Sequence, residues 1–236
     1  MNDAMSQNDT PCLRVNDLAR MPYAKALDYQ RRMHEQVLGG AAPMTVLLVE
    51  HDPVITVSRR RSASQHLLVP PAQLAELGID LQLTDRGGDI TYHGPGQLVA
   101  YPILRLGLLS FNIGRYVYWL EQIIIDTVAH FGIEARRDRC ARGVWVAQPY
   151  EAKLCAVGVR VRKNVTMHGL ALNISTNLDH FNTIIPCGLR GRRVVSLKKL
   201  LADRVPTMAQ VKHALIETMC NEFNRRIHVV SRNQPS

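Results

Sequence analysis

Residues 154–174 read LCAVGVRVRKNVTMHGLALNI, and this stretch decides the fold class. Residues 154–161 and 165–174 both have the apolar composition of strands, and no helix fits between them. Strands that follow one another without an intervening helix favour an α+β fold, in which a mixed or antiparallel sheet has flanking helices, over a doubly wound parallel sheet.

Three segments around this stretch show signals typical of helices. Residues 22–38 begin with proline and are followed by two glycines. Residues 112–132 repeat apolar residues at helical spacing behind Asn112, a suitable N-cap. Thr207 and Gln210 form a capping box that opens a helix ending near Arg225. A shorter helix is expected at 71–77, and further strands at 44–50, 54–58, 79–83, 97–104 and 144–147.

The domain organisation predicted from the sequence is simple. We expect residues 1–20 to be a flexible N-terminal segment, because the chain begins with a polar stretch. No change of composition marks a boundary farther along, so residues 21–230 are predicted to form a single domain.

Composition limits the possible functions of the 236-residue chain. Hydrophobic residues make up 46%, which excludes a disordered chain, and no apolar run is long enough for a membrane span. Because no signal peptide is recognisable, we expect a cytoplasmic protein. The net charge of +9 should attract acidic partners, either nucleic acids or acidic carrier proteins. With only four Phe and two Trp, a platform for stacking nucleic-acid bases is not evident.

Common catalytic and metal-binding motifs are absent from the sequence. The five cysteines include no C-x-x-C pair, so a disulfide framework or a zinc site is not expected. The chain also lacks a P-loop, a G-x-S-x-G elbow and an H-E-x-x-H pair.

A loop at residues 86–97, RGGDITYHGPGQ, is the first candidate site. Its two glycine groups allow the backbone to approach a ligand closely, and exposed N–H groups in such a loop can hold an oxyanion or a carbonyl. Arg86 can bind an anion, and His93 can donate or accept a hydrogen bond. The glycines would also suit a plain pair of tight turns, but the Arg, Thr, Tyr and His among them favour a binding site.

Lys153 and His168 each alternate in phase with apolar residues of a predicted strand. If the strand starts at Lys153, this residue shares a face with Cys155 and Val157. A buried lysine can accept protons near neutral pH, although at the end of a strand it can also extend to water. His168 shares its phase with Leu170, which indicates a half-buried histidine, either in a site or bonded to a backbone carbonyl in the core.

Cys187 is the stronger of two candidate nucleophiles. Pro186 and Gly188 fix a bend that exposes it, and the arginines that follow favour the thiolate. Cys155 is the rival because of its predicted face, but a mid-strand cysteine is often a small core residue. A thiol activated by an amine is one route to acyl transfer through a thioester, although the sequence does not show that Lys153 and Cys187 meet.

The segment 86–101, RGGDITYHGPGQLVAY, closely resembles the signature of the lipoyl(octanoyl) transferases, the lipoate-protein ligase B family. Matching segments occur in the same order at 51–59, 143–146 (GVWV), 153–158 (KLCAVG), 168–173 (HGLALN) and 186–188 (PCG). The resemblance spans about residues 20–205. It implies the α+β fold that biotin and lipoate ligases share.

The resemblance implies transfer of an octanoyl group from octanoyl-acyl carrier protein to a lysine of a lipoyl domain, the first step of protein lipoylation. The implied acceptors are the lipoyl domains of 2-oxoacid dehydrogenases and the glycine cleavage H protein. No metal, nucleotide or other cofactor is implied, because the donor thioester already supplies the activation. We expect no nucleic-acid or membrane partner, and a monomer.

The resemblance also assigns roles to residues. It implies that Cys187 is the nucleophile that holds the acyl group as a thioester, and that Lys153 activates the thiol and shuttles protons. The implied substrate contacts are Arg86, Gly87, Gly88, Asp89, Ile90, Thr91, Tyr92, His93, Ala156, Val157, Gly158, His168, Gly169, Leu170 and Ala171.

The chain departs from the family pattern at three places. Ser58 stands where the family often has glycine, Cys155 stands where it has a small apolar residue, and residues 188–196 are rich in arginine. None of these removes a catalytic residue, but the arginines leave the docking surface open.

Two alternatives remain. The first is an ATP-dependent lipoate or biotin ligase on the same fold, which would not need the cysteine of the PCG segment. The second is a non-catalytic nucleic-acid or carrier-protein binding module, which rests on charge alone.

Overall fold

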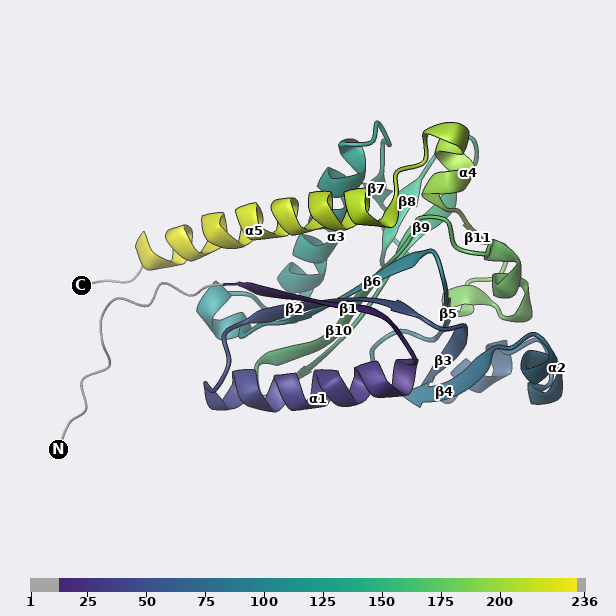
Figure 1. The fold of residues 1–236 in the computed structure, drawn as a ribbon, viewed down its shortest axis with the longest axis horizontal. Helices are drawn as coiled ribbons and strands as arrows, with labels where there is room; N and C mark the ends of the chain where they lie inside the picture. Colours follow the sequence, from purple (N-terminus) through teal and green to yellow (C-terminus); the bar gives the residue numbers. More distant parts are fainter. Residues whose placement is uncertain (1–12, 233–236) are drawn as a thin grey trace.

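The computed structural model describes residues 13–232, with backbone only for residues 229–232. Two sheets lie next to each other, and the smaller one lies beside one end of the larger (Figure 1). The strands of the larger sheet are β1 (Arg14–Met21), β2 (Thr45–His51), β6 (Gln97–Ile103), β7 (Arg136–Arg137), β8 (Val144–Val146), β9 (Ala152–Arg162), β10 (Val165–Asn173) and β11 (Arg193–Val194). The strands of the smaller sheet are β3 (Val54–Ser58), β4 (Asp80–Thr84) and β5 (Ile90–His93).

The pairing of the strands confirms the predicted mixed sheet. The larger sheet has the order β1-β2-β6-β10-β9-β8-β7, with β11 beside β9, and the smaller has the order β4-β3-β5. The central pairs of the larger sheet are antiparallel, whereas β1–β2, β9–β11 and β3–β4 are parallel. Lys163 and Asn164 join β9 to β10 with φ values of 49° and 64°, as a two-residue hairpin turn requires.

The helices cover both faces of the larger sheet. Helix α1 lies on one face, and α3 and α5 lie on the other (Figure 1). The helices are α1 (Tyr23–Gly39), α2 (Pro71–Glu76), α3 (Ile113–Ala129), α4 (Leu197–Leu201) and α5 (Met208–Arg232). Short 3-10 turns are η1 (Ala63–His66), η2 (Leu106–Leu109), η3 (Leu178–Thr183), η4 (Pro186–Gly188) and η5 (Ala202–Arg204).

Two helix starts predicted from the sequence are confirmed. The side chain of Asn112 accepts a hydrogen bond from the N–H of Arg115 at 2.8 Å. Gln210 Oε1 accepts from the Thr207 N–H at 2.8 Å, and Thr207 Oγ1 accepts from the Gln210 N–H at 3.2 Å, which is the capping box. Helix α5 continues past the predicted end at Arg225 to Arg232.

Part of the segment expected to be flexible is instead a strand. Residues 14–21 form β1, which pairs in parallel with β2 from Arg14 opposite Thr45 to Met21 opposite His51. Many of its side chains are exposed, so backbone pairing holds the strand and the sequence carries little hydrophobic signal for it. Residues 1–12, which complete the predicted segment, lie outside the described residues.

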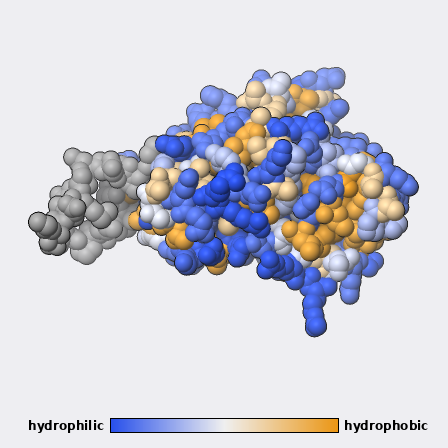
Figure 2. Space-filling view, turned by 60° about the horizontal axis from the view of Figure 1, so that its bottom comes forward, coloured by the Kyte–Doolittle hydropathy of each residue, from blue (hydrophilic) through white to orange (hydrophobic). Residues whose placement is uncertain are grey.

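Two other local predictions differ from the structure. Residues 90–93 of the expected loop form β5, which pairs with β3. Leu81 and Leu83 were expected to face a core with Ile79, but only Ile79 is buried, and Leu83 is 78% exposed. Within residues 13–232, the exposure of Leu81 and Leu83 shows that little covers the face of β4 that these two leucines share. Figure 2 shows an apolar patch within hydrophilic surface toward the end of the molecule where α2 and β4 lie.

Candidate active site

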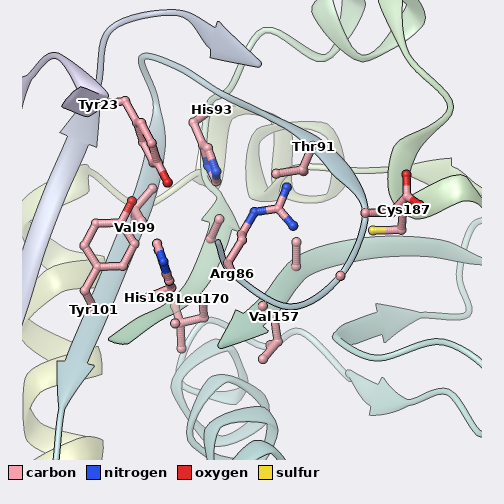
Figure 3. Close-up of a pocket in the computed structure, with 16 residues that line it drawn as sticks. Tyr23, Arg86, Thr91, His93, Val99, Tyr101, Val157, His168, Leu170 and Cys187 are labelled. Carbon is pink, nitrogen blue, oxygen red and sulfur yellow. The ribbon is translucent and has the colours of Figure 1, made fainter. Parts of the chain in front are cut away.

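A pocket lies between the two sheets (Figure 3), and its empty space, counted together with the open solvent at its mouth, is about 480 Å³. Its walls come from the start of α1, the loop before β5, strands β5, β6, β9 and β10, and the turn η4. The lining residues are Tyr23, Arg86, Gly88, Asp89, Thr91, His93, Val99, Tyr101, Ala156, Val157, Gly158, His168, Gly169, Leu170, Ala171 and Cys187.

Cys187 stands at one end of this pocket, on the turn η4. Its backbone has φ 58° and ψ 15°, in the left-handed region that non-glycine residues rarely adopt. Two contacts with His66 hold the turn: the carbonyl of His66 accepts from the Ile185 N–H at 2.8 Å, and the imidazole ring lies against Gly188. The thiol is half-buried, so a substrate can reach it.

Lys153 meets Cys187. Its Nζ lies 3.1 Å from the Cys187 Sγ, and the side chain is buried, with 6% of the residue exposed. The amine also lies over the ring of Trp145, 4.9 Å from the centroid. The Lys153 carbonyl accepts from the Val195 N–H at 3.0 Å, which fixes the end of β9 against the segment that follows Cys187.

The predicted shared face of Lys153 and Cys155 is wrong. Strand β9 has a register shift opposite β8: Val144 pairs with Cys155, but Trp145 pairs with Lys153. One extra residue in β9 interrupts the strict alternation on which the prediction depended. The Lys153 amine therefore reaches Cys187, while the Cys155 side chain lies in the main core.

Cys155 is poorly placed to act as a nucleophile. The residue is 0% exposed, and burial raises the pKa of its thiol to about 12. A thiol with such a pKa is almost never a thiolate at neutral pH, and the thiolate is the nucleophile. The surroundings thus distinguish the two candidate nucleophiles: Cys155 lies in the core, whereas Cys187 lines the pocket.

Arg86 brings a positive charge toward the Cys187 side chain. Its guanidinium donates to the carbonyl and to Oγ1 of Thr56 at 2.9 and 3.0 Å, and no carboxylate of the described residues lies within ion-pair distance. Burial lowers the pKa of Arg86, and the nearby Cys187 side chain acts in the opposite direction. The Oγ of Ser58 donates to the Gly88 carbonyl at 3.0 Å, so the departure at this position steadies the loop that carries Arg86.

Two histidines stand farther along the pocket, and both are held neutral by burial. The pKa of His93 is lowered to about 3, and its Nδ1 lies 2.7 Å from Gln97 Oε1. His168 is buried almost completely and has a left-handed φ of 56°. Burial lowers its pKa despite a contact of 2.8 Å between its Nε2 and Asp85 Oδ1. The same hydrogen bond lowers the pKa of Asp85 to about 2.

The remaining predicted contacts divide between the pocket and the core. Ile90 and Tyr92 point into the small core under the second sheet, because β5 alternates between its two faces. Gly87 does not line the pocket, and its N–H donates to the Val159 carbonyl at 2.9 Å. The other predicted contacts do line the pocket.

Three lining residues were not singled out from the sequence: Tyr23, Val99 and Tyr101. Val99 and Tyr101 lie within the segment 86–101 that resembles the family signature, so this resemblance could have pointed to them as pocket residues. Tyr23 is the first residue of α1, and nothing near it in the sequence pointed to the pocket.

Residues 13–232 contain neither a metal-binding cluster nor a membrane-spanning helix. That part of the chain holds no group of three or more His, Cys, Asp or Glu side chains that could bind a metal ion. Nor does any helix in it combine the length and apolar composition needed to cross a membrane.

Comparison with known proteins decides the family. The family model described as the lipoyl protein ligase A/B catalytic domain matches residues 22–220. The chain belongs to the lipoyl protein ligase A/B family. Within this family, an octanoyltransferase of Chloroflexus aggregans is 42% identical over 215 residues, covering 91% of this chain and 96% of the relative. A mitochondrial octanoyltransferase of Arabidopsis thaliana is 35% identical over 225 residues, covering 95% and 94% of the two chains.

Solved structures of two protein ligases share the fold. A bipartite lipoate protein ligase from Thermoplasma acidophilum superposes with a TM-score of 0.68 at 16% identity, covering 93% of this chain and 90% of that chain. A biotin protein ligase from Aquifex aeolicus gives 0.52 at 12% identity, covering 91% and 70%. The fold expected from the resemblance, that of lipoate and biotin ligases, is therefore confirmed.

Proposed function

We propose that Cys187 and Lys153 carry out octanoyl transfer through a thioester on the Cys187 sulfur. The chain is an octanoyltransferase of protein lipoylation, as its sequence relatives are. The observation that carries the proposal is the distance of 3.1 Å between the Lys153 amine and the Cys187 thiol at one end of the pocket. A nucleophile and a base within hydrogen-bond reach are the signature of covalent catalysis.

In the first half-reaction the Lys153 amine accepts the thiol proton of Cys187. The thiolate attacks the carbonyl carbon of the donor thioester, and the bond between that carbon and the donor sulfur breaks. The donor thiolate leaves and takes the proton back from the Lys153 ammonium. Arg86 has no carboxylate partner among the described residues, so its charge favours the anionic sulfur and the developing oxyanion.

In the second half-reaction the amine of an acceptor lysine attacks the carbonyl carbon of the Cys187 thioester. The carbon–sulfur bond breaks, an amide forms, and Lys153 passes the released proton from the amine to the Cys187 sulfur. The buried position of Lys153 suits both transfers, because little water competes for the proton. No resident cofactor enters either half-reaction.

The proposed donor is octanoyl-acyl carrier protein, and the proposed acceptors are lipoyl domains of 2-oxoacid dehydrogenases and of the glycine cleavage H protein. Acyl carrier proteins and lipoyl domains are the general partners of this family. The net charge of +9 favours acidic carriers of both kinds.

Intact-protein mass spectrometry tests the covalent step. Wild-type protein incubated with octanoyl-acyl carrier protein should gain one octanoyl group, which a lipoyl domain then discharges. Cys187→Ala should gain none. Cys155→Ala, the matched loss of a thiol from the core, should gain it as the wild type does. An adduct on Cys187→Ala would refute the assignment of the nucleophile.

Replacing the base tests the second residue. Lys153→Met keeps much of the side-chain length but has no amine, and acylation of Cys187 should slow by about 10²–10⁴-fold. A wild-type rate would contradict the role of Lys153. The ATP-dependent ligase alternative, which the names of the relatives support less, predicts instead that free octanoate and ATP release pyrophosphate.

A further inference from the structure

The pocket has a closed end opposite the nucleophile. Figure 3 shows Cys187 at one side and the rings of Tyr23 and Tyr101 at the other, with Arg86 between them. Tyr23 comes from the start of α1 and Tyr101 from β6, so the closed end joins a helix to the middle of the larger sheet. Each tyrosine is 3% exposed.

Hydrogen bonds behind the pocket fix both rings. The Tyr23 hydroxyl lies 2.8 Å from Thr84 Oγ1, at the end of β4. The Tyr101 hydroxyl lies 2.8 Å from His51 Nε2, and His51 Nδ1 in turn lies 3.1 Å from the Met21 carbonyl. Neither ring can swing away without breaking a buried hydrogen bond, so this end of the pocket is rigid.

Ring contacts join the two tyrosines into one block. Tyr23 stacks on His93 with ring centroids 6.3 Å apart, and Tyr101 meets His168 edge-on at 6.3 Å. His51 contacts Tyr23 at 5.4 Å and Tyr101 at 5.9 Å. Burial keeps the imidazoles of His51 and His93 neutral, with pKa values of about 4 and 3. The block therefore presents uncharged rings to the pocket.

Between Cys187 and this block, the lining includes polar residues such as Arg86 and Thr91, but it also includes apolar side chains that suit a hydrocarbon chain. Val99, Val157 and Leu170 line the pocket along the sheet (Figure 3). We expect an acyl group attached to the Cys187 sulfur to extend along these side chains toward the tyrosines.

We propose that Tyr23 and Tyr101 form an end wall that sets the longest acyl chain this protein transfers. The proposal rests on the proposed function, because it requires the acyl group to lie on Cys187 within this pocket. A rigid wall excludes a chain that is too long more strongly than a mobile one would, since close-packed protein gives way little to added methylenes.

The test measures chain-length preference in competition. Wild-type protein is incubated with an equimolar mixture of hexanoyl, octanoyl, decanoyl and dodecanoyl thioesters of acyl carrier protein, and mass spectrometry counts each adduct on Cys187. Tyr23→Ala and Tyr101→Val should raise decanoyl and dodecanoyl adducts relative to octanoyl by roughly tenfold, the effect of accommodating two more methylenes. Val99→Leu, which fills the pocket, should shift the preference toward hexanoyl.

Two controls separate volume from other effects. Tyr116→Val removes a buried tyrosine ring that does not line the pocket, and it should keep the wild-type ranking of chain lengths. Tyr23→Phe keeps the ring but loses the hydrogen bond to Thr84, so it should shift the ranking less than Tyr23→Ala does. Circular dichroism identifies any variant that does not fold, and in that case the opposite shift in Val99→Leu decides.

The outcomes distinguish the end wall from the function itself. An unchanged ranking in folded Tyr23→Ala, Tyr101→Val and Val99→Leu would overturn the end wall while leaving acyl transfer intact. Equal loss of all chain lengths in the folded tyrosine variants would also overturn it, because the tyrosines would then serve the chemistry. If wild-type Cys187 gains no acyl group of any length, the proposed function fails instead.

Discussion

Cys187 adopts a left-handed backbone conformation that costs a non-glycine residue roughly 1 kcal/mol. The surrounding structure maintains this conformation through the His66 ring, which Asp89 holds by a contact of 2.6 Å between its Oδ1 and His66 Nδ1. Strain of this kind persists where contacts over-determine the backbone, and it is common at reactive residues. The precise direction of the thiol therefore depends on Gly188 and on the imidazole packed against it.

A matched pair of glycines in one loop tests this dependence. Gly188 and Gly191 have φ values of 69° and 75°, so alanine introduces similar backbone strain at either. A Cβ on Gly188 would lie 2.8 Å from His66 Cε1, whereas a Cβ on Gly191 would have no neighbour within 4 Å. Gly188→Ala should slow acylation of Cys187 at least about tenfold more than Gly191→Ala. Stopped-flow acylation measures both, and equal rates would show that the His66 contact is unimportant.

At the scale of single residues, the sequence predicted which residues belong to the candidate site better than it predicted what surrounds them. The Pro-Cys-Gly bend marked Cys187, because proline and glycine restrict the backbone in a way that local sequence reveals. Lys153 was also selected, but from a face that it does not occupy. The extra residue in β9 depends on how β8 pairs with it, and strict alternation within one strand contains no information about its partner.

Elements with their own periodicity or capping signal were predictable, and elements held by pairing were not. Helix α3 has an apolar stripe and a cap, whereas β1 is held mainly by its backbone pairing with β2. Exposure of Leu83 likewise depends on which elements cover an edge strand, a property of the tertiary structure. Tyr23 was missed because the pocket depends on where α1 docks, which the helix itself does not encode.

The aromatic block that joins α1, β2 and β5 makes the fold sensitive to acid. The pKa of His51 falls to about 4 in the folded state from an ordinary 6.5. Above pH 6.5 neither state binds the proton. As the pH falls from 6.5 to about 4, the unfolded chain gains a proton that the folded chain excludes, so stability decreases by roughly 3 kcal/mol.

Urea unfolding at about pH 7 and about pH 4.5 measures this loss. At the lower of these pH values, the ionised Asp85 still stabilises the folded state. Its pKa is lowered from 3.8 to about 2 on folding, so this stabilisation is lost only at more acidic pH. His51→Gln should reduce the difference in the free energy of unfolding between the two pH values. His213→Gln, an exposed substitution on α5, should leave that difference unchanged. If both variants lost the same unfolding free energy between the two pH values, the buried imidazole of His51 would not be the cause of the acid sensitivity.

Across the whole molecule, positive charge exceeds negative charge by nine. Salt bridges absorb some of the arginines, as when Arg192 pairs with Asp138 and Glu151, but Arg190 has no ion pair among those of the described residues. Such a surface steers acidic partners mainly through their association rate, which salt screens.

Salt should therefore weaken recognition of the acidic carrier protein without affecting recognition of the acyl group. The KM for octanoyl-acyl carrier protein should rise several-fold between about 0.05 and about 0.3 M salt. The KM for a small uncharged octanoyl thioester should change little, because its recognition depends on the pocket. Steady-state kinetics with both donors measures the two KM values. Parallel changes in them would rule out long-range electrostatic attraction between the protein and its acidic carrier.

The walls of the pocket come from distant parts of the chain. Tyr23 lies near its start, while Cys187 and the segment that anchors β9 lie near its end. During synthesis on the ribosome, a nascent chain that stops at residue 186 already contains the other lining residues but lacks the proposed nucleophile. Under the proposed mechanism, a growing chain therefore cannot accept an acyl group until Cys187, the last of the lining residues in sequence order, has been translated.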